Sequence, residues 1–348
     1  MTSYLIIGGN GFLGQHVQEQ IRLVKDASTI TVFDLSRPKH PEPDVQYVVG
    51  DLRNYQDVYD ALEGITAVIH TASPPPVDSD HPPRDLYFDI NVKGTLNVIK
   101  ACQERGIKVL VVTSSGSVIS TGEDMVNVDE DTPYPPKAID VYTESKIECE
   151  KQVLNANGVK GLRTCTLRPS AIFGPRDHLT IPGMIQICRN GQHRYQTGNN
   201  QSLMDFTYVG NIAYAHVLAA QKLAMPDSGA AGQAFNVTNG TPIPFWDFAS
   251  RVWATYGYYM PNHKKIILSK QTSFAIASIQ EKIYRFKLLF WDESQVKKSL
   301  SKARLKQAMA SRYFNIEKAR TILGYEPQVS LDEGIKLSVA WYKEQYPQ

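Results

Sequence analysis

Short runs of β-branched and other apolar residues alternate, through the first half of the chain, with longer segments in which apolar residues recur every three or four positions. Such short runs are typical of buried strands. They predict strands at residues 4–7, 29–33, 45–49, 67–70, 109–113 and 163–167. Strands that alternate with helices form a parallel sheet with helices on both faces. The pattern therefore predicts an α/β protein built on a doubly wound parallel sheet.

The helical segments between these strands each carry one apolar face. In the first, the apolar residues are Leu13, Val17, Ile21 and Val24, and in a later one they are Val92, Leu96 and Ile99. Residues three and four apart lie on the same side of a helix. Each of these helices is therefore expected to lay one apolar stripe on the sheet.

Composition and charge narrow the class of protein without identifying it. Of the 348 residues, 42% are hydrophobic and 21% are charged, which is the profile of a folded globular protein. The formal net charge is only +2, so the chain lacks the basic surplus that a nucleic-acid backbone would attract. We expect no nucleic-acid partner.

The cysteines and the N-terminus bear on compartment and metal binding. The four cysteines, at positions 102, 149, 165 and 188, have none of the close Cys or His spacing that is typical of zinc sites. They are expected to be buried reduced thiols, and no metal site is predicted. The first apolar run begins at Tyr4 and meets glycine at once, which leaves no room for a secretory signal. We therefore expect an intracellular protein, cytoplasmic in the simplest case.

A glycine-rich turn follows the first predicted strand directly. Gly8, Gly11 and Gly14 are spaced Gly-x-x-Gly-x-x-Gly, and Phe12 and Leu13 open the first predicted helix. Glycine allows a sharp turn and a close approach to a pyrophosphate, while the helix N-terminus supplies free N–H donors and positive potential. This turn, placed between a strand and a helix, predicts a dinucleotide-binding Rossmann fold.

Asp34 ends the second predicted strand, 20 residues after Gly14. A carboxylate at this place accepts hydrogen bonds from the adenosine ribose hydroxyls and repels a 2′-phosphate. The sequence therefore favours NAD as the cofactor, although the nearby Arg37 keeps NADP open.

Two further clusters follow the third and fourth predicted strands. Asp51 and Leu52 come after the third, and Thr71, Ala72 and Ser73 come after the fourth. Ligands of open α/β sheets bind at the carboxyl ends of the strands. We assign the first cluster to the adenine and the second to the nicotinamide side of the cofactor.

Tyr142 and Lys146 lie four residues apart in a predicted helix, so both project from one face. A nearby ammonium and a positive nicotinamide ring would favour the phenolate and lower the pKa of Tyr142 from its ordinary value of about 10. Ser115 follows the fifth predicted strand, where its hydroxyl can bind the substrate oxygen. The three residues predict an acid/base site for the oxidation of an alcohol, in which Lys146 also holds the nicotinamide ribose.

The alternation of strands and helices decays after residue 168, where proline, glycine and aromatic residues become more frequent. We interpret residues 1–170 as a dinucleotide-binding domain that also contains the catalytic Ser, Tyr and Lys. Residues 171–348 are expected to form mainly a smaller C-terminal substrate lobe, with part of the segment returning to the Rossmann domain.

Over essentially its whole length the sequence resembles the extended short-chain dehydrogenase/reductase superfamily. The resemblance implies that Ser115, Tyr142 and Lys146 are the catalytic triad. It also implies cofactor contacts for the three glycines and the two aspartates named above. Segments 167–177, 205–213 and 314–319, followed by Leu-Gly-Tyr at 323–325, look like the 3β-hydroxysteroid dehydrogenase branch. Within that branch they most resemble fungal sterol-4α-carboxylate 3-dehydrogenases (decarboxylating).

The same resemblance extends the cofactor site. It implies that the segment containing Pro169 and Ile172 passes beside the nicotinamide, and that Asn91 mainly supports the sheet. The implied reaction is the NAD(P)-dependent oxidation of a sterol 3β-hydroxyl, with a 4α-carboxysterol losing carbon dioxide to give a 3-ketosterol.

Other readings of the sequence remain open. The enzyme could act on a triterpenoid or another terpenoid alcohol in specialised metabolism, or it could be a nucleotide-sugar epimerase. A non-catalytic dinucleotide sensor is a different class, but a sensor would not need Ser115, Tyr142 and Lys146 together. The oligomeric state also stays open, a homodimer included.

Residues 272–306 combine apolar and basic side chains. Phe286, Phe290 and Trp291 accompany several isoleucines, but intervening charges exclude a helix that spans a membrane. Basic residues at 297, 298, 302, 304 and 306 follow. The segment is either an amphipathic contact with a membrane, which would place the protein on the cytoplasmic face of the endoplasmic reticulum, or a substrate lid with a solvated helix face.

Overall fold

A seven-stranded parallel sheet forms the centre of the molecule. The computed structural model describes residues 2–24, 27–75, 83–261, 264–288, 290–291 and 302–347. The strands of the sheet lie in the order β12-β7-β5-β4-β1-β2-β3. Their bounds are β1 (Thr2–Ile7), β2 (Ala27–Asp34), β3 (Val45–Val49), β4 (Ala67–His70), β5 (Val109–Thr113), β7 (Arg163–Pro169) and β12 (Gln233–Val237). The six strands predicted from the sequence are all present, and the doubly wound fold is confirmed.

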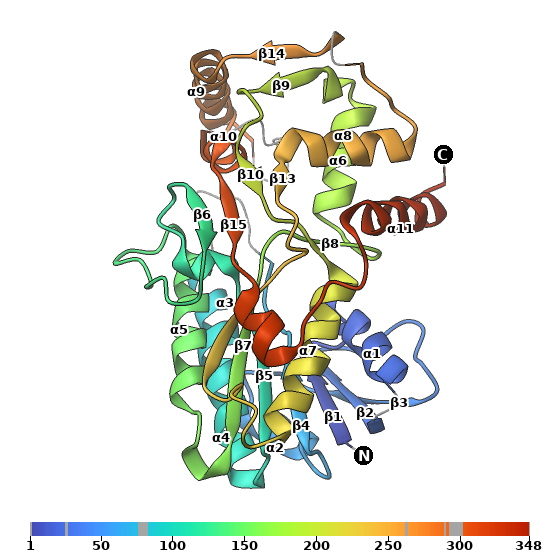
Figure 1. The fold of residues 1–348 in the computed structure, drawn as a ribbon, viewed down its shortest axis with the longest axis vertical. Helices are drawn as coiled ribbons and strands as arrows, with labels where there is room; N and C mark the ends of the chain where they lie inside the picture. The colour runs from blue at the N-terminus through green and yellow to red at the C-terminus, as the bar shows by residue number, and fades with distance from the viewer. Residues whose placement is uncertain are drawn as a thin grey trace.

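Helices cover both faces of this sheet (Figure 1). On one face, α1 (Phe12–Val24) and α7 (Val209–Ala224) pack against a cluster that includes Tyr4 and Ile6. On the other face, α2 (Tyr55–Ala61), α4 (Thr95–Arg105) and α5 (Val141–Asn155) pack against a cluster that includes Leu5 and Ile7. Successive residues of β1 are therefore buried on opposite sides, which is why the strand reads as a continuous apolar run.

The seventh strand, β12, comes from the second half of the chain. It pairs in parallel with β7 from Gln233 opposite Cys165 to Val237 opposite Pro169. α7, also from the second half, covers one face of the sheet. Local sequence pattern did not predict either element, and β12 finds its partner strand more than 60 residues away along the chain.

The remaining elements form a smaller lobe above the carboxyl edge of the sheet (Figure 1). Its four-stranded sheet has the order β13-β10-β15-β6, and two strand pairs, β11-β8 and β14-β9, accompany it. The strands are β6 (Met125–Val128), β8 (Ile172–Phe173), β9 (Tyr195–Thr197), β10 (Leu203–Met204), β11 (Thr207–Tyr208), β13 (Ile243–Pro244), β14 (Ile266–Leu268) and β15 (Arg312–Phe314). The helices are α6 (Thr180–Arg189), α8 (Phe245–Tyr256), α9 (Lys270–Lys287), α10 (Lys302–Met309) and α11 (Leu331–Gln345).

Short helical turns join the larger elements. Those made of 3-10 helix are η2 (Gly116–Ile119), η3 (Val159–Gly161) and η4 (Gln192–Arg194). The single turn α3 (Arg84–Tyr87) leads into η1 (Phe88–Gly94), which is a π-helix, and η7 (Ala319–Leu323) is a second π-helix.

The predicted apolar stripe of Val92, Leu96 and Ile99 is wrong in part, because the wide π turns of η1 change the phase of the helix. Leu96 is 46% exposed, whereas the polar residues Asn91 and Thr95 are buried. A π turn forms hydrogen bonds between residues five positions apart instead of four, so the residues that follow it are rotated about the helix axis. The segment thus directs two polar side chains toward the sheet and α5.

α5, the helix that carries Tyr142 and Lys146, is attached to β7 by a buried ion pair. Glu150 of α5 accepts a hydrogen bond from the Arg168 guanidinium at 2.7 Å, and both side chains are almost fully buried. The Tyr134 hydroxyl and the Thr166 hydroxyl donate to the same carboxylate at 2.8 and 3.1 Å. Burial raises the pKa of Glu150, but Arg168 and these hydrogen bonds outweigh it and hold that pKa below its ordinary value.

Removing one member of this pair should destabilise the fold. Glu150→Gln should lower the free energy of unfolding by about 3 kcal/mol or more, because it leaves a buried guanidinium without its counter-ion. Urea denaturation followed by circular dichroism measures the loss. Glu144→Gln on the same helix is the matched control, since the Arg84–Glu144 pair is exposed and should contribute less than about 1 kcal/mol. Equal losses for the two variants would contradict the role given to Glu150.

Candidate active site

The strand order gathers the predicted site residues along one edge of the sheet. Because the strands are parallel, all their carboxyl ends lie at this edge. The segments that follow neighbouring strands are therefore neighbours in space. From β3 to β7 the row consists of Asp51 and Leu52, Asp34, the glycine turn, Thr71 to Ser73, Ser115, and Pro169 with Ile172. This order matches the predicted course of a dinucleotide from adenine to nicotinamide.

The glycine turn is too crowded for side chains. Gly8 has a φ of +79°, and a Cβ there would lie 2.7 Å from backbone atoms of Ala72. A Cβ on Gly14 would lie 2.6 Å from the Cα of Gly9. The turn closes with a hydrogen bond from the Gly11 N–H to the Gly8 carbonyl, and α1 begins at Phe12. Only glycine therefore fits this turn, which places a helix N-terminus, with Phe12 and Leu13 in its first turn, where a pyrophosphate would bind.

Asp34, the last residue of β2, contacts the glycine turn. Its carboxylate accepts the N–H of Asn10 at 3.0 Å and the N–H of Leu35 at 2.8 Å. These contacts fix the half-buried carboxylate beside the glycine turn, where the adenosine ribose of a dinucleotide would lie. Arg37, three residues further along, is exposed.

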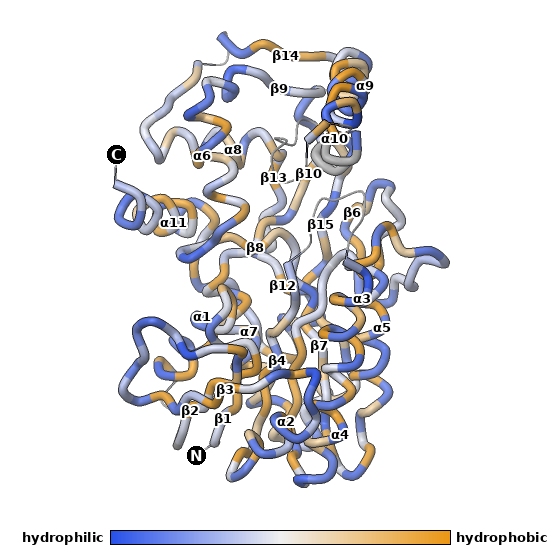
Figure 2. The backbone as a smooth tube through the Cα atoms, turned by 180° about the vertical axis from the view of Figure 1, so that it is seen from behind, coloured by the Kyte–Doolittle hydropathy of each residue, from blue (hydrophilic) through white to orange (hydrophobic). Residues whose placement is uncertain are grey.

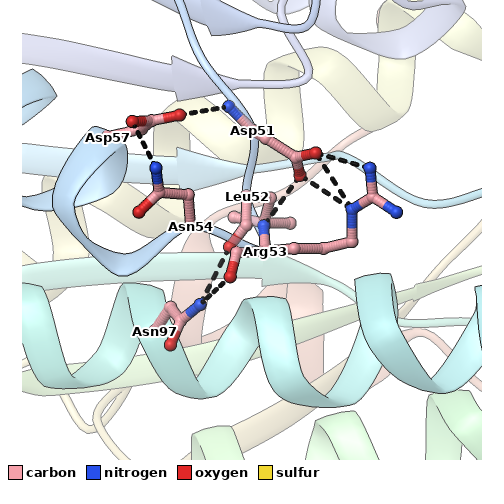
Figure 3. Close-up of polar contacts among 6 residues, drawn as sticks. All are labelled: Asp51, Leu52, Arg53, Asn54, Asp57 and Asn97. Carbon is pink, nitrogen blue, oxygen red and sulfur yellow. Dashed lines mark hydrogen bonds and ion pairs between the residues drawn. The ribbon is translucent and has the colours of Figure 1, made fainter.

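Asp51 lies at the carboxyl end of β3, but its carboxylate pairs with a neighbouring residue (Figure 3). The Arg53 guanidinium donates to it at 2.5 and 3.0 Å, and these hydrogen bonds lower the pKa of Asp51. The side chain of Leu52 is buried against Gly94, and the Leu52 carbonyl accepts a hydrogen bond from Asn97. The predicted contact of Asp51 and Leu52 with adenine stays a prediction.

The segment after β4 is held against the glycine turn. The Thr71 hydroxyl donates to the carbonyls of Ile7 and Gly8 at 3.0 and 3.2 Å, and the Ala72 N–H donates to Ile7. Ser73 donates its hydroxyl to Pro74. The segment that contains Thr71, Ala72 and Ser73 therefore lies between the glycine turn after β1 and the segment after β5 that carries Ser115.

Ser115 and Tyr142 meet through their hydroxyl groups. Ser115 caps η2, accepting the Ser117 N–H at 3.2 Å, and it hydrogen-bonds the Tyr142 side chain. Asp140 caps α5 by accepting the Thr143 N–H at 2.7 Å, so Tyr142 lies in the first turn of the helix. Both hydroxyl-bearing side chains remain partly accessible.

Lys146 lies one turn further along α5 and is almost completely buried. Its Nζ donates to the Thr113 carbonyl, at the end of β5, at 2.6 Å. Burial lowers its pKa, while Cys149 and Glu150 oppose that change. The ammonium is thus anchored beside the segment that contains Ser115.

The expected lowering of the Tyr142 pKa is wrong for the protein by itself. Burial raises the pKa of Tyr142 to about 12, and the hydrogen bond with Ser115 offsets only part of that effect. The physical reason is that the low-polarity surroundings disfavour a phenolate, and the neighbouring Asp140 and Tyr87 add to the effect.

Several supporting residues were not found from the sequence. The Tyr87 ring packs edge-on against Tyr142 with centroids 5.8 Å apart, and its hydroxyl donates to the Pro75 carbonyl. His70 is buried next to Thr95, and burial lowers its pKa to about 3, so it is neutral. None of these residues belongs to a spaced motif, and only their position at strand or helix ends could have suggested them.

Asn91 supports the catalytic helix indirectly. Its amide donates to the Ser145 hydroxyl at 2.9 Å, and that hydroxyl donates to the Tyr142 carbonyl at 2.7 Å. Asn91 thus has a structural role, as expected, but its amide supports α5 and not the sheet.

The segment after β7 completes the row. β7 ends at Pro169, and Ile172 pairs with Thr207 between β8 and β11. The Thr207 hydroxyl donates to the Ser170 carbonyl at 2.6 Å, which holds the backbone between Pro169 and Ile172.

These residues fit a nicotinamide dinucleotide. The glycine turn lies at the N-terminus of α1, where free N–H groups can bind a pyrophosphate, and Asp34 offers a carboxylate to the ribose beside it. Tyr142 and Lys146 stand at the other end of the row. Within the described ranges no group of three or more His, Cys, Asp or Glu side chains could hold a metal ion.

Sequence comparison connects this site to named relatives. Residues 5–268 match the model of the 3-beta hydroxysteroid dehydrogenase/isomerase family. The chain is 39% identical over 336 residues to the mouse (Mus musculus) sterol-4-alpha-carboxylate 3-dehydrogenase, decarboxylating, and covers 89% of it with 96% of its own length. It is 40% identical to the enzyme of that name from Schizosaccharomyces pombe, with coverage of 98% and 97% respectively.

Solved structures with the same fold include NAD-bound enzymes. The Bordetella bronchiseptica enzyme WbmH, in complex with NAD+, has a TM-score of 0.74 at 19% identity, over 99% of this chain and 100% of that one. The UDP-N-acetylglucosamine 4-epimerase of Bacillus cereus has a TM-score of 0.72 at 18% identity, over 98% and 99%. At this identity the likeness shows the fold alone. From its motifs, its fold and its near full-length relatives, the chain belongs to the 3-beta hydroxysteroid dehydrogenase/isomerase family and is an NAD(P)-dependent dehydrogenase of the extended short-chain type.

Proposed function

We propose that the protein oxidises the 3β-hydroxyl of a 4α-carboxysterol with NAD and that the product loses carbon dioxide to become a 3-ketosterol. The observation that carries the proposal is the meeting of Ser115 and Tyr142 beside Lys146, at the sheet edge that also holds the glycine turn. Likeness to decarboxylating sterol dehydrogenases over nearly the whole chain supports the choice of substrate.

Ser115, Tyr142 and Lys146 have different roles in the transfer of the hydroxyl proton. Ser115 and Tyr142, joined by their hydrogen bond, can both contact the alcohol oxygen. Tyr142 accepts the hydroxyl proton, and the positive charge of Lys146 stabilises the phenolate form that does so. NAD, when bound, supplies a hydride acceptor for carbon 3, and its positive ring favours the phenolate further.

Loss of carbon dioxide follows from the product's own chemistry. Oxidation of carbon 3 turns a 4-carboxysterol into a β-keto acid. The electrons of the bond between carbon 4 and the carboxylate pass into the enolate of the new carbonyl, and carbon 4 then takes up a proton. The reaction therefore needs from the chain only the oxidation and a site that holds the carboxylated ring.

Replacement of Tyr142 tests the acid/base assignment. Tyr142→Phe should lower kcat for oxidation of a 4-carboxy-3β-hydroxysterol by about 100-fold or more, because the proton acceptor is lost. NADH formation measures the rate, and NADH fluorescence on binding should show that the cofactor site survives. Tyr346→Phe, at an exposed position at the end of α11 and outside the site, is the control. Near-normal turnover by a folded Tyr142→Phe enzyme would rule out the assignment.

The preference for NAD over NADP is proposed from Asp34. Asp34 is held beside the glycine turn by two backbone N–H groups, so its negative charge would meet a 2′-phosphate at close range. The exposed Arg37 is the alternative determinant.

Asp34→Ala should therefore weaken the use of NAD and lower the preference for NAD over NADP by about 10-fold or more, in line with the loss of hydrogen bonds to a charged group. The ratio of kcat/KM values for the two cofactors measures the effect. Asp227→Ala, at an exposed loop position, should leave that ratio unchanged. A wild-type enzyme that prefers NADP would refute the assignment and point to Arg37.

We also propose that the far end of the substrate lobe contacts a membrane surface, as suits a water-insoluble substrate. α9 buries Ser273 and Ala277 on one side and exposes Ile279, Ile283 and Phe286. The rings of Phe290 and Trp291 extend this apolar face beyond the helix, with Phe286 and Phe290 centroids 5.3 Å apart. Figure 2 shows apolar positions on α9 and β14 at the end of the lobe farthest from the main sheet.

Charged residues accompany the apolar face of α9. Lys282, Arg285 and Lys287 are exposed and can meet anionic headgroups. Lys302 and Lys306 instead form ion pairs with Glu281 and Glu123. Three further basic side chains were expected to contribute to the contact, but they lie outside what the structure describes: those at 297, 298 and 304. No described helix is long and apolar enough to cross a membrane. A peripheral position on the cytoplasmic face of the endoplasmic reticulum would agree with this arrangement.

Liposome flotation tests the contact. Binding should rise with the content of anionic lipid and fall with salt, because basic side chains contribute to it. Replacing Phe286, Phe290 and Trp291 together with serine should lower binding by about 10-fold or more, since their apolar area no longer enters the interface. Leu23→Ser removes an exposed apolar residue from α1 and should have no effect. Equal flotation of the triple variant and the wild type would favour a lid instead.

A further inference from the structure

The orientation of the Tyr142 ring depends on the side chains that surround it. Tyr142 lies in the first turn of α5, just after the cap residue Asp140, and its side chain hydrogen-bonds Ser115. Lys146, one turn further along, donates to the Thr113 carbonyl. A hydrogen bond at the tip of a phenol does not fix the plane of the ring, because rotation about the bond to a tyrosine ring is only loosely restricted. Packing against the ring must therefore set its plane.

Tyr87 supplies such packing. The ring centroids of Tyr87 and Tyr142 are 5.8 Å apart, and the two ring planes meet at 72°. Edge-on packing at this distance is an arrangement that pairs of aromatic rings prefer. The contact therefore favours one orientation of the Tyr142 ring over others.

Tyr87 is itself held firmly. It is the last residue of α3, its side chain is buried, and its hydroxyl donates to the Pro75 carbonyl at 2.9 Å. Pro75 belongs to the segment after β4 that begins with Thr71 and is predicted to lie on the nicotinamide side of the cofactor. The Tyr87 ring is thus held by the helix at one end and by this segment at the other.

Two hydrogen-bonded contacts attach the segment around Tyr87 to α5. Arg84, at the start of α3, donates to both carboxylate oxygens of Glu144 at 2.6 and 2.8 Å. Asn91, in η1, donates to the Ser145 hydroxyl at 2.9 Å. Tyr87 lies between Arg84 and Asn91 in the sequence, so these contacts keep its ring against the first turn of α5.

We propose that Tyr87 is a positioning residue whose ring holds the Tyr142 phenol in the orientation that brings its hydroxyl to Ser115 and to the alcohol oxygen. The inference rests on the proposed function, through the role of Tyr142 as proton acceptor, and not on which alcohol is oxidised. Tyr87 takes no part in the proton transfer, since its own hydroxyl is bound to Pro75. Its effect is on rate, because a displacement of about 1 Å between reacting groups can slow a reaction by about 100-fold.

Replacing the ring tests this role. Tyr87→Leu should lower the single-turnover rate of NADH formation with a 4-carboxy-3β-hydroxysterol by about 10-fold or more, while KM for NAD stays near its wild-type value. Tyr87→Phe keeps the ring and should retain most of the rate. Tyr342→Leu is the matched control, because Tyr342 is also buried and packs edge-on against Tyr256, with centroids 6.1 Å apart, in the smaller lobe. It should leave the rate unchanged.

A double-mutant cycle separates positioning from a general loss of structure. Added to Tyr142→Phe, Tyr87→Leu should leave the residual rate unchanged, because the hydroxyl that Tyr87 positions is already absent. A general loss of structure would lower the rate equally in both backgrounds. Circular dichroism checks folding, and Tyr87→Met, another apolar side chain without a ring, takes the place of Tyr87→Leu in the cycle if the leucine variant does not fold.

Three results would each overturn the inference. They are a wild-type rate in Tyr87→Leu, equal losses with and without the Tyr142 hydroxyl, and equal losses in Tyr87→Leu and Tyr87→Phe. If the wild type does not oxidise the 4-carboxysterol, the proposed substrate is wrong, and the same cycle decides the role of Tyr87 with a 3β-hydroxysterol or terpenoid alcohol that it does oxidise. If the wild type oxidises none of these alcohols, the proposed function fails, and this inference with it.

Discussion

The buried pair of Glu150 and Arg168 fixes the helix on which the chemistry depends. One charge comes from α5 and the other from β7, so the pair sets the position of Tyr142 and Lys146 relative to the carboxyl edge of the sheet. Lys146 adds a second attachment by donating to the end of β5. Two neighbouring strands thus hold one helix, and with it the two side chains that are proposed to be catalytic.

The smaller lobe is connected to the same edge through β15. Phe314 packs on Gly116, next to Ser115, and the Phe314 N–H donates to the buried carboxylate of Asp205. Burial raises the pKa of Asp205 to about 6, although the Phe314 N–H opposes that change. The strand at residues 312–314 therefore lies against the segment that carries Ser115. Under the proposed function, the smaller lobe would hold the sterol nucleus next to the sheet edge that would hold the cofactor.

The sequence predicted those parts of the fold and site that local pattern determines. The strands between Tyr4 and Leu167 are apolar on both faces, so each is visible as a run without knowledge of its neighbours. Gly8 and Gly14 were identifiable because no other residue fits their turn. The strand at 233–237, the phase change at Asn91 and the contact between Phe314 and Gly116 depend on partners far away in the chain. The raised pKa of Tyr142 could not be predicted from the sequence for the same reason, because the burial that raises it depends on the whole fold. The boundary between residues 170 and 171, and the roles of Asp51 and Leu52 toward adenine, stay predictions.

The central claim is that one site oxidises carbon 3 of a 4-carboxysterol and that carbon dioxide leaves as a consequence of that oxidation. The most direct measurement incubates the purified protein with NAD and a 3β-hydroxysterol whose 4-carboxylate is isotopically labelled, and then counts NADH, labelled carbon dioxide and 3-ketosterol together. The account predicts one NADH and one carbon dioxide for each 3-ketosterol formed, with no effect of a metal chelator, because the new carbonyl itself stabilises the enolate. NADH formed without release of the label, or label released without NADH, would contradict it.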